Sequence, residues 1–225
     1  MRRALAAAAA LALALPGVAA AATVEVAEEC YAEDDEIDVR GTGFTPNGDV
    51  RLALERASGE VLETSTDPVA NAEGAVVGEY KVKAETGWFG RTQTRFDMTL
   101  RLTDQTDPTT VATTSFIFSR WNVGVRTVGG RIQPNRPAAF NAVGFTTSVG
   151  KPLYAHWLRN GRRVFSKRLG VLRGPCGDVK ARLARGFPFR PVRRGSYQVR
   201  FTPSRTNLSR AAISFPAARV TRRIP

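Results

Sequence analysis

Apolar and polar residues alternate along several stretches of the chain, which is the period of a β-strand with one buried face. The alternation is clear in three stretches: 49–55, 95–103 and 196–201. In the second stretch Met98, Leu100 and Leu102 share one face, with polar residues between them. Beyond residue 22, helical periodicity is never sustained for three turns. The pattern therefore predicts an all-β protein.

Turn-forming residues separate the expected strands. The strongest signal is Asn160-Gly161, which lies between apolar stretches at 154–158 and 163–169 and is typical of a two-residue β-hairpin. Other turn signals occur at 46–48, 58–59, 71–74 and 107–108. Short strands joined by such turns indicate antiparallel sheets.

A short internal repeat divides the chain. Gly-Phe-Thr occurs at 43–45 and again at 144–146, each time after a strand-like stretch and before a turn and another strand. Gly59 and Gly161 then mark the next turn in each copy. This shared order predicts two tandem antiparallel β-sandwiches of about 100 residues each.

The first 22 residues differ in composition from the rest. Arg2 and Arg3 precede a run of 12 residues made only of Ala and Leu, followed by Pro16, Gly17 and several alanines. A basic start, a short apolar run and small residues are typical of a secretory signal peptide, which we assign to residues 1–22. An uncleaved anchor is the alternative, but the run is short for a membrane span of roughly 20 residues. We expect a secreted protein, extracellular or in the cell envelope.

Charge separates the chain at the same place as the repeat. The whole sequence has a net charge of +13. Residues 23–118 contain 8 basic and 19 acidic residues, a net charge of −11, whereas residues 119–225 contain 23 basic residues and one acid, Asp178, a net charge of +22. We therefore expect an acidic domain at 23–118 and a basic domain at 119–225.

One segment resembles a known family. Residues 41–46 read Gly-x-Gly-Phe-x-Pro inside a strand and turn at 37–50. This run resembles bacterial extracellular immunoglobulin-like domains of the IPT/TIG type, over about 20 residues. The second copy keeps Gly144 and Phe145 but lacks the proline. The resemblance implies an immunoglobulin-like sandwich with a binding or spacer role, and it implies no catalytic residue.

The two cysteines, Cys30 and Cys176, fall in different expected domains. An even number of cysteines in an exported protein predicts a disulfide, and here one pairing within the chain is available. Two buried thiols, or pairing between chains, are the alternatives. Cys30 lies in an acidic region and Cys176 in a basic one, so we expect charge attraction to help the disulfide dock the domains.

Seven carboxylates surround Cys30. They are Glu28, Glu29, Glu33, Asp34, Asp35, Glu36 and Asp38. Such a cluster could hold calcium, but it lacks the alternating Asp-x-Asp-x-Asp-Gly spacing of a calcium loop. We expect a solvated or docking face, and we assign no metal site.

An enzyme is the competing hypothesis. His156 followed by Cys176 is similar to the order in sortases and, in spacing, to the L,D-transpeptidases of the cell wall, which would make the chain a cysteine acyltransferase with His156 as base and Cys176 as nucleophile. The residues before Cys176 contain neither the serine nor the second histidine of the transpeptidase motif, and the threonine-rich strand of sortases is missing. The alternative role for His156 is packing, on a strand beside Tyr154.

The basic domain is the expected binding surface. Six cations in pairs are assigned to anion binding: Arg162, Arg163, Lys167, Arg168, Arg193 and Arg194. Outside the cell the available polyanions are wall polymers, acidic polysaccharides and lipid headgroups, whereas nucleic acid is not expected as a physiological partner. The alternative is that about half of the excess charge merely offsets the acidic domain.

We find no cofactor motif, and a single histidine excludes a zinc site with two histidines. The sequence predicts a non-enzymatic binding or structural module of the cell envelope.

Overall fold

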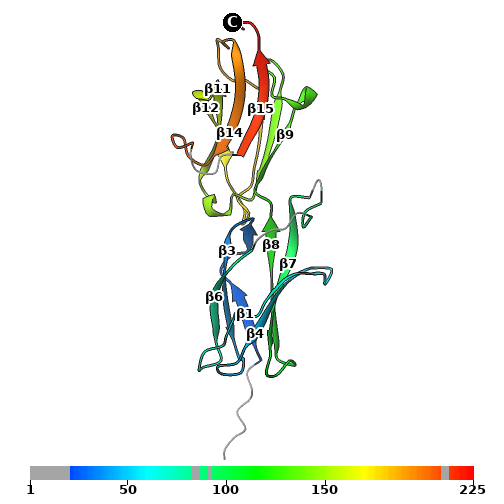
Figure 1. The fold of residues 1–225 in the computed structure, drawn as a ribbon. Coiled ribbons are helices and arrows are strands. Elements are labelled where there is room, and N and C mark those ends of the chain that lie inside the picture. Colours follow the sequence, from blue (N-terminus) through cyan, green and yellow to red (C-terminus); the bar gives the residue numbers. More distant parts are fainter. Residues whose placement is uncertain (1–20, 83–86, 91–92, 209–212) are drawn as a thin grey trace, which may run out of the picture.

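The structure is a computed structural model that describes residues 21–225 except 83–86, 91–92 and 209–212. The predicted signal peptide, residues 1–22, therefore lies outside the described residues apart from its last two. The chain forms two β-sandwiches that follow one another end to end (Figure 1). The predicted fold class, an all-β chain with two tandem sandwiches, is confirmed.

The first sandwich contains a three-stranded and a five-stranded sheet, with strand orders β1-β3-β6 and β2-β8-β7-β4-β5. The strands are β1 Thr23–Val26, β2 Cys30–Ala32, β3 Glu36–Thr42, β4 Val50–Arg56, β5 Val61–Ser65, β6 Val76–Lys81, β7 Arg95–Asp104 and β8 Val111–Ser119. The short strand β2 runs parallel to β8, and the other pairs are antiparallel.

The second sandwich contains a three-stranded and a four-stranded antiparallel sheet, with strand orders β13-β10-β9 and β12-β11-β14-β15. The strands are β9 Asn122–Arg126, β10 Ala138–Val143, β11 Pro152–Arg159, β12 Arg162–Val171, β13 Val179–Leu183, β14 Gly195–Thr202 and β15 Ile213–Val220. Two short 3₁₀ turns, η1 at Val128–Gly130 and η2 at Thr146–Ser148, lie in its loops.

Each sandwich has its own hydrophobic core. In the first, Met98, Leu100 and Leu102 are completely buried, as their alternation predicts. In the second, Trp157 and Phe201 are completely buried. Separate cores are typical of units that could fold as domains.

The two sandwiches also share one topology. The order β6-β3-β1 corresponds to β13-β10-β9, and β8-β7-β4-β5 corresponds to β15-β14-β11-β12, so β2 is the addition in the first sandwich. The repeated Gly-Phe-Thr follows β3 in one sandwich and β10 in the other. The repeat in the sequence therefore marks equivalent places in the two folds.

The second sandwich has two features of immunoglobulin folds. Trp157 is buried on β11, the strand that precedes the Asn160-Gly161 hairpin. The Tyr197 hydroxyl, near the start of β14, donates a hydrogen bond to the carbonyl of Arg193 at 2.9 Å. A buried Trp in the core and a tyrosine bonded to the backbone a few residues upstream are both found in immunoglobulin sandwiches.

Candidate functional site

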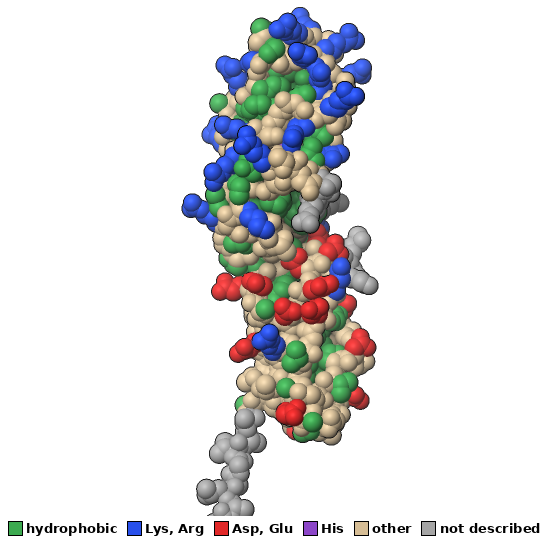
Figure 2. Space-filling view, turned by 90° about the vertical axis from the view of Figure 1, so that its left-hand side faces the viewer, with side chains coloured by type: hydrophobic (Ala, Val, Ile, Leu, Met, Phe, Trp, Pro, Cys, Tyr) green, Lys and Arg blue, Asp and Glu red, His purple; other side chains and the backbone are tan. Residues whose placement is uncertain are grey.

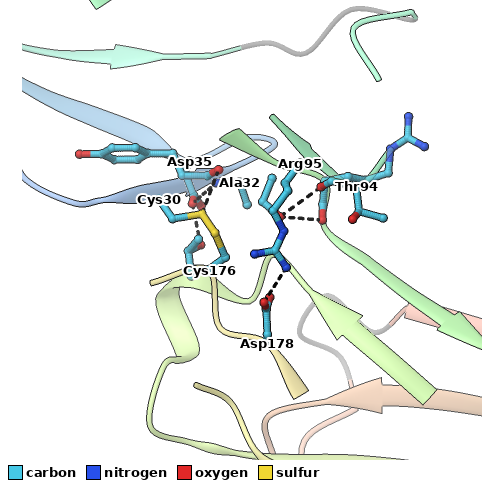
Figure 3. Close-up of a disulfide and its surroundings, with 11 residues drawn as sticks. Cys30, Ala32, Asp35, Thr94, Arg95, Cys176 and Asp178 are labelled. Atoms are coloured by element: carbon cyan, nitrogen blue, oxygen red, sulfur yellow. Dashed lines mark hydrogen bonds and ion pairs between the residues drawn. A yellow bond between two sulfur atoms is a disulfide. The ribbon is translucent and has the colours of Figure 1, made fainter. Parts of the chain in front are cut away.

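The predicted disulfide between Cys30 and Cys176 is present at the joint between the sandwiches (Figure 3). Cys30 is the first residue of β2, and Cys176 lies in the turn before β13. Their Cα atoms are 5.2 Å apart, and both side chains are buried. The bond therefore links the two halves covalently, at a place that solvent reaches poorly.

Asp35 ties the same joint together by hydrogen bonds. Its Oδ2 accepts from the backbone amide of Ala32 at 2.7 Å and from the hydroxyl of Thr146, on η2, at 2.7 Å. One carboxylate oxygen thus fixes the turn between β2 and β3 and also holds a loop of the second sandwich. Hydrogen bonds to a charged acceptor are stronger than neutral ones, so this contact gives the joint a defined geometry.

The ion pairs at the joint differ from the expected charge docking. Arg95 of the acidic half lies 2.6 Å from Asp178 of the basic half, which is the reverse of the net charges (Figure 3). Arg120 and Glu33 have the expected signs, but their closest atoms are 3.8 Å apart. Each of these four side chains is exposed by about a third or more, so solvent screens both pairs. We conclude that specific contacts and the disulfide, rather than net charge, hold the joint.

Most of the acidic cluster faces solvent. Five of its seven members are exposed, and Glu33 and Asp35 are half-buried at the joint. Figure 2 shows acidic side chains below the middle of the molecule and Lys and Arg side chains over the upper half. Within the described ranges, no group of three or more His, Cys, Asp or Glu side chains is placed to hold a metal ion. The cluster is therefore a solvated face that contributes Asp35 to the joint.

His156 is completely buried, although it points away from the core of the second sandwich. Its Nε2 lies 3.0 Å from the carbonyl oxygen of Ser204, and its Nδ1 lies 2.7 Å from the hydroxyl of Ser166. Because a carbonyl only accepts, the Nε2 atom donates and the neutral ring accepts from Ser166 at Nδ1. Burial lowers the pKa of His156, the Ser204 carbonyl opposes this, and the charge of Arg163 lowers it further.

Residues 204–206, which follow β14, cover this histidine. Besides the Ser204 contact, Arg163 donates to the backbone carbonyls of Arg205 and Thr206 at 2.9 and 3.1 Å. The Tyr154 ring stacks on the imidazole with centroids 6.1 Å apart. His156 is thus a packing residue beside Tyr154, more deeply buried than the sequence indicates.

The structure does not support the acyltransferase hypothesis for His156 and Cys176. Cys176 is bonded to Cys30, so it offers no thiolate, and no cysteine in the described part of the chain is free. Both ring nitrogens of His156 are engaged by serines under a loop, whereas Cys176 lies at the joint. A nucleophile and a base need hydrogen-bond reach of each other, and these two residues serve separate structural purposes.

The six cations assigned to anion binding are all exposed in the second sandwich. Four belong to β12, an edge strand, and Arg193 and Arg194 lie just before β14. Asn160 and Ser196 hydrogen-bond to each other, which brings the start of β12 and the segment before β14 to the same end of the sheet. Arg162 and Arg194 therefore lie at the same end of the sheet, while Lys167 and Arg168 lie further along β12.

Sequence reasoning missed the contacts of Asp35, Thr146 and Arg95. The partners are separated by 111 residues in one case and 83 in the other, so no local pattern marks them. The available signal was Asp178, the single acidic residue among 119–225. An isolated acid in a strongly basic region is a candidate for a specific partner.

No helix among the described residues is long and apolar enough to cross a membrane. No protein family matches the chain, and no curated protein matches it. The resemblance to IPT/TIG domains therefore stays a prediction.

Many solved structures are similar to this chain at a low level, and two of them serve as examples. One is a tetra-tandem repeat in the extending region of a large adhesion protein, at 14% identity and a TM-score of 0.31, covering 91% of this chain and 48% of that one. The other is the BSP domain of a biofilm associated protein, at 10% identity and a TM-score of 0.31, covering 89% of this chain and 29% of that one. This chain spans about half the length of the first and less than a third of the second.

Proposed function

We propose that the protein is an exported, non-enzymatic binding or structural module of the cell envelope, with an acidic domain at 23–118 and a basic domain at 119–225. The signal-like first 22 residues and the disulfide support export, because disulfides persist in oxidising compartments. In this proposal the basic domain contacts anionic polymers or surfaces, and the acidic domain carries it.

The proposal rests mainly on the near absence of acidic side chains that could pair with the cations of the basic domain. Asp178 is the single acid among 119–225, and it already pairs with Arg95 of the other half. Among the described cations of the basic domain, Arg120 alone forms an ion pair, with Glu33. Most of the other described cations of this domain are exposed, and a surface with such an excess of positive charge attracts polyanions and raises their rate of association.

The disulfide and the Asp35 contact give the basic domain a fixed place on its carrier. A surface held in one orientation loses less entropy on binding an extended polymer than a mobile one does. The partners that suit this charge outside the cell are wall polymers, acidic polysaccharides and lipid headgroups. Nucleic acid would bind by charge alone, without sequence preference.

Salt-dependent retention on immobilised heparin tests the proposal. The oxidised protein without residues 1–22 is expected to elute above physiological ionic strength, about 0.15 M. Arg162→Gln, Arg168→Gln and Arg194→Gln together should lower the eluting salt concentration clearly. The matched control replaces three exposed cations of the acidic domain, Arg40, Arg51 and Lys81, with Gln and should elute close to the parent. Elution of the parent below physiological salt would overturn the proposal.

A further inference from the structure

Two arginines outside the predicted set flank a small residue on the other sheet of the basic sandwich. Ala139 of β10 is directly opposite Arg126 of β9 on one side and Arg182 of β13 on the other. Ala138 and Phe140 belong to the core, so Ala139 faces outward, and the two arginines opposite it share that face. Their Cα atoms are two strand spacings apart, about 10 Å, which lets two long side chains reach one point above Ala139.

A pocket of about 350 Å³ lies between these arginines. Its lining consists of Arg126, Thr127, Pro137, Ala138, Ala139 and Arg182. The lining thus combines small apolar residues with two cations. The lining contains no acidic side chain, and the one acid of the basic domain, Asp178, pairs with Arg95 at the joint. The charge of the two guanidinium groups is therefore not neutralised from within their own domain.

Thr127 provides an independent observation at the same place. Its hydroxyl oxygen is buried yet has no hydrogen-bond partner among the described residues. A buried polar atom without a partner is rare, and a bound ion or water at the site is one of its accepted explanations. Here the unpaired hydroxyl belongs to a residue that lines the pocket between two cations.

We propose that this pocket binds a phosphate group of a linear polyanion through the Arg126 and Arg182 guanidinium groups, and that the Thr127 side chain rotates about its Cα–Cβ bond to bring its buried hydroxyl to the ligand. Arginine forks bind tetrahedral oxyanions through paired N–H donors, and a hydroxyl can donate to a third oxygen. The inference rests on the proposed function and names both the site and the class of ligand.

The next pair of residues on the same face of this sheet favours a polymer over a single anion. Lys180 and Asn141 are directly opposite each other, two residues along their strands from Arg182 and Ala139. Two residues along a strand correspond to about 6.7 Å. A chain with a charged group on successive units could therefore place one phosphate between the arginines and the next near Lys180, which is exposed.

Calorimetric titration with a short linear polyphosphate, in about 0.15 M salt, tests the site. Arg126→Gln with Arg182→Gln is expected to weaken binding by about tenfold or more, whereas the charge-matched control, Arg219→Gln with Arg222→Gln at two exposed cations outside both proposed sites, should weaken it by about threefold at most. Thr127→Val leaves the charge unchanged and is expected to weaken binding several-fold. In amide NMR spectra of the parent, the largest shift changes should centre on Ala139.

Several outcomes separate this inference from the proposed function. If both double variants lose the same affinity for polyphosphate, the ligand is attracted by the positive charge of the whole domain. That result would overturn the proposed pocket and leave the proposed function standing. Equal affinity for polyglutamate would overturn the assignment to phosphate. Binding to anionic lipid vesicles without binding to soluble polyphosphate would replace the polymer with a membrane surface. If neither heparin nor polyphosphate binds, both proposals fail. Unchanged melting temperatures confirm that the variants are folded.

Discussion

Arg95 and Asp178 form an ion pair across the joint, with Nη2 and Oδ2 2.6 Å apart, and each carries the charge that is in the minority in its half of the protein. The pair therefore does not follow from attraction between an acidic and a basic body. It is a specific contact at one point, beside the disulfide and the hydrogen bond from Thr146 to Asp35. A joint built from such contacts has one preferred orientation, which net charge alone would not provide.

Asp178→Asn removes this ion pair while keeping the shape of the side chain. Because the two side chains are 43% and 33% exposed, we expect a loss of only about 0 to 1 kcal/mol in the free energy of unfolding. The loss should shrink further at about 1 M salt, which screens exposed charges. Urea unfolding measures it, and Arg95→Gln provides the matched partner. If the double variant loses the sum of the two single losses, the pair does not couple.

The disulfide should contribute far more than the ion pair. It joins residues 146 positions apart, and closing so long a loop in the unfolded chain gives an upper estimate of about 5 kcal/mol. Cys30→Ala with Cys176→Ala should therefore lower the unfolding midpoint in urea strongly. Reductant should produce a comparable shift in the parent and none in the variant. A variant as stable as the oxidised parent would contradict this expectation.

Features set by local chemistry were predictable from the sequence. Asn160 and Gly161 both adopt positive φ, 48° and 80°, as a two-residue hairpin turn requires, and their residue types indicate such a turn. The disulfide was predictable because the sequence starts like a secretory signal peptide and its two cysteines allow one internal pair. The repeat at 43–45 and 144–146 was visible because it marks an equivalent turn in both sandwiches.

Features set by long-range contacts were not predictable. His156 is covered by Ser204, which lies 48 residues further along the chain. No local periodicity in the sequence predicts a contact over that distance. The pocket beside Ala139 depends on the register of three strands, which brings Arg126 and Arg182 to the same residue. The sequence analysis selected arginines that are adjacent in the chain. Arg126 and Arg182 lie on the two strands that flank β10, so they are close in space although they are far apart in the sequence.

The stability of the basic sandwich should fall in mildly acidic solution because of His156. Burial lowers the pKa of this imidazole in the folded protein. Below the ordinary histidine pKa of about 6.5 the unfolded chain binds a proton that the folded chain does not, so folding weakens as the pH falls. The melting temperature should drop between pH 7.5 and pH 5, and His156→Gln should flatten this dependence. An unchanged slope in the variant would assign the effect to other groups.

Asp104 should stabilise the acidic sandwich down to low pH. Its burial acts to raise the pKa, but hydrogen bonds from Thr45, Asp107 and Thr106 outweigh it and lower the pKa to about 2. The stabilisation is complete above the ordinary value of about 3.8 and is lost as the pH falls toward 2. Asp104→Asn should cost about 1 to 3 kcal/mol at neutral pH, as expected for hydrogen bonds to a charged group. Asp97→Asn, an exposed control, should cost little in the same urea titration.

Gly177 should tolerate no side chain, because the fold brings it against the backbone of Phe145. Its φ is +62°, and a Cβ atom there would lie 2.3 Å from the Phe145 carbonyl oxygen. Gly74 meets the carbonyl of Phe44 at the same distance in the first sandwich, so the contact belongs to the shared topology.

The neighbouring Cys176 is fixed by the disulfide, so the backbone at Gly177 has little room to move away. Gly177→Ala should therefore destabilise the basic sandwich by more than the cost of positive φ alone, which is about 1 kcal/mol. Gly150→Ala isolates that cost, since Gly150 has a φ of +79° but a Cβ atom added there would meet nothing within 4 Å. Thermal unfolding of the two variants gives the comparison, and equal melting temperatures would show that the Phe145 carbonyl yields to the added methyl group.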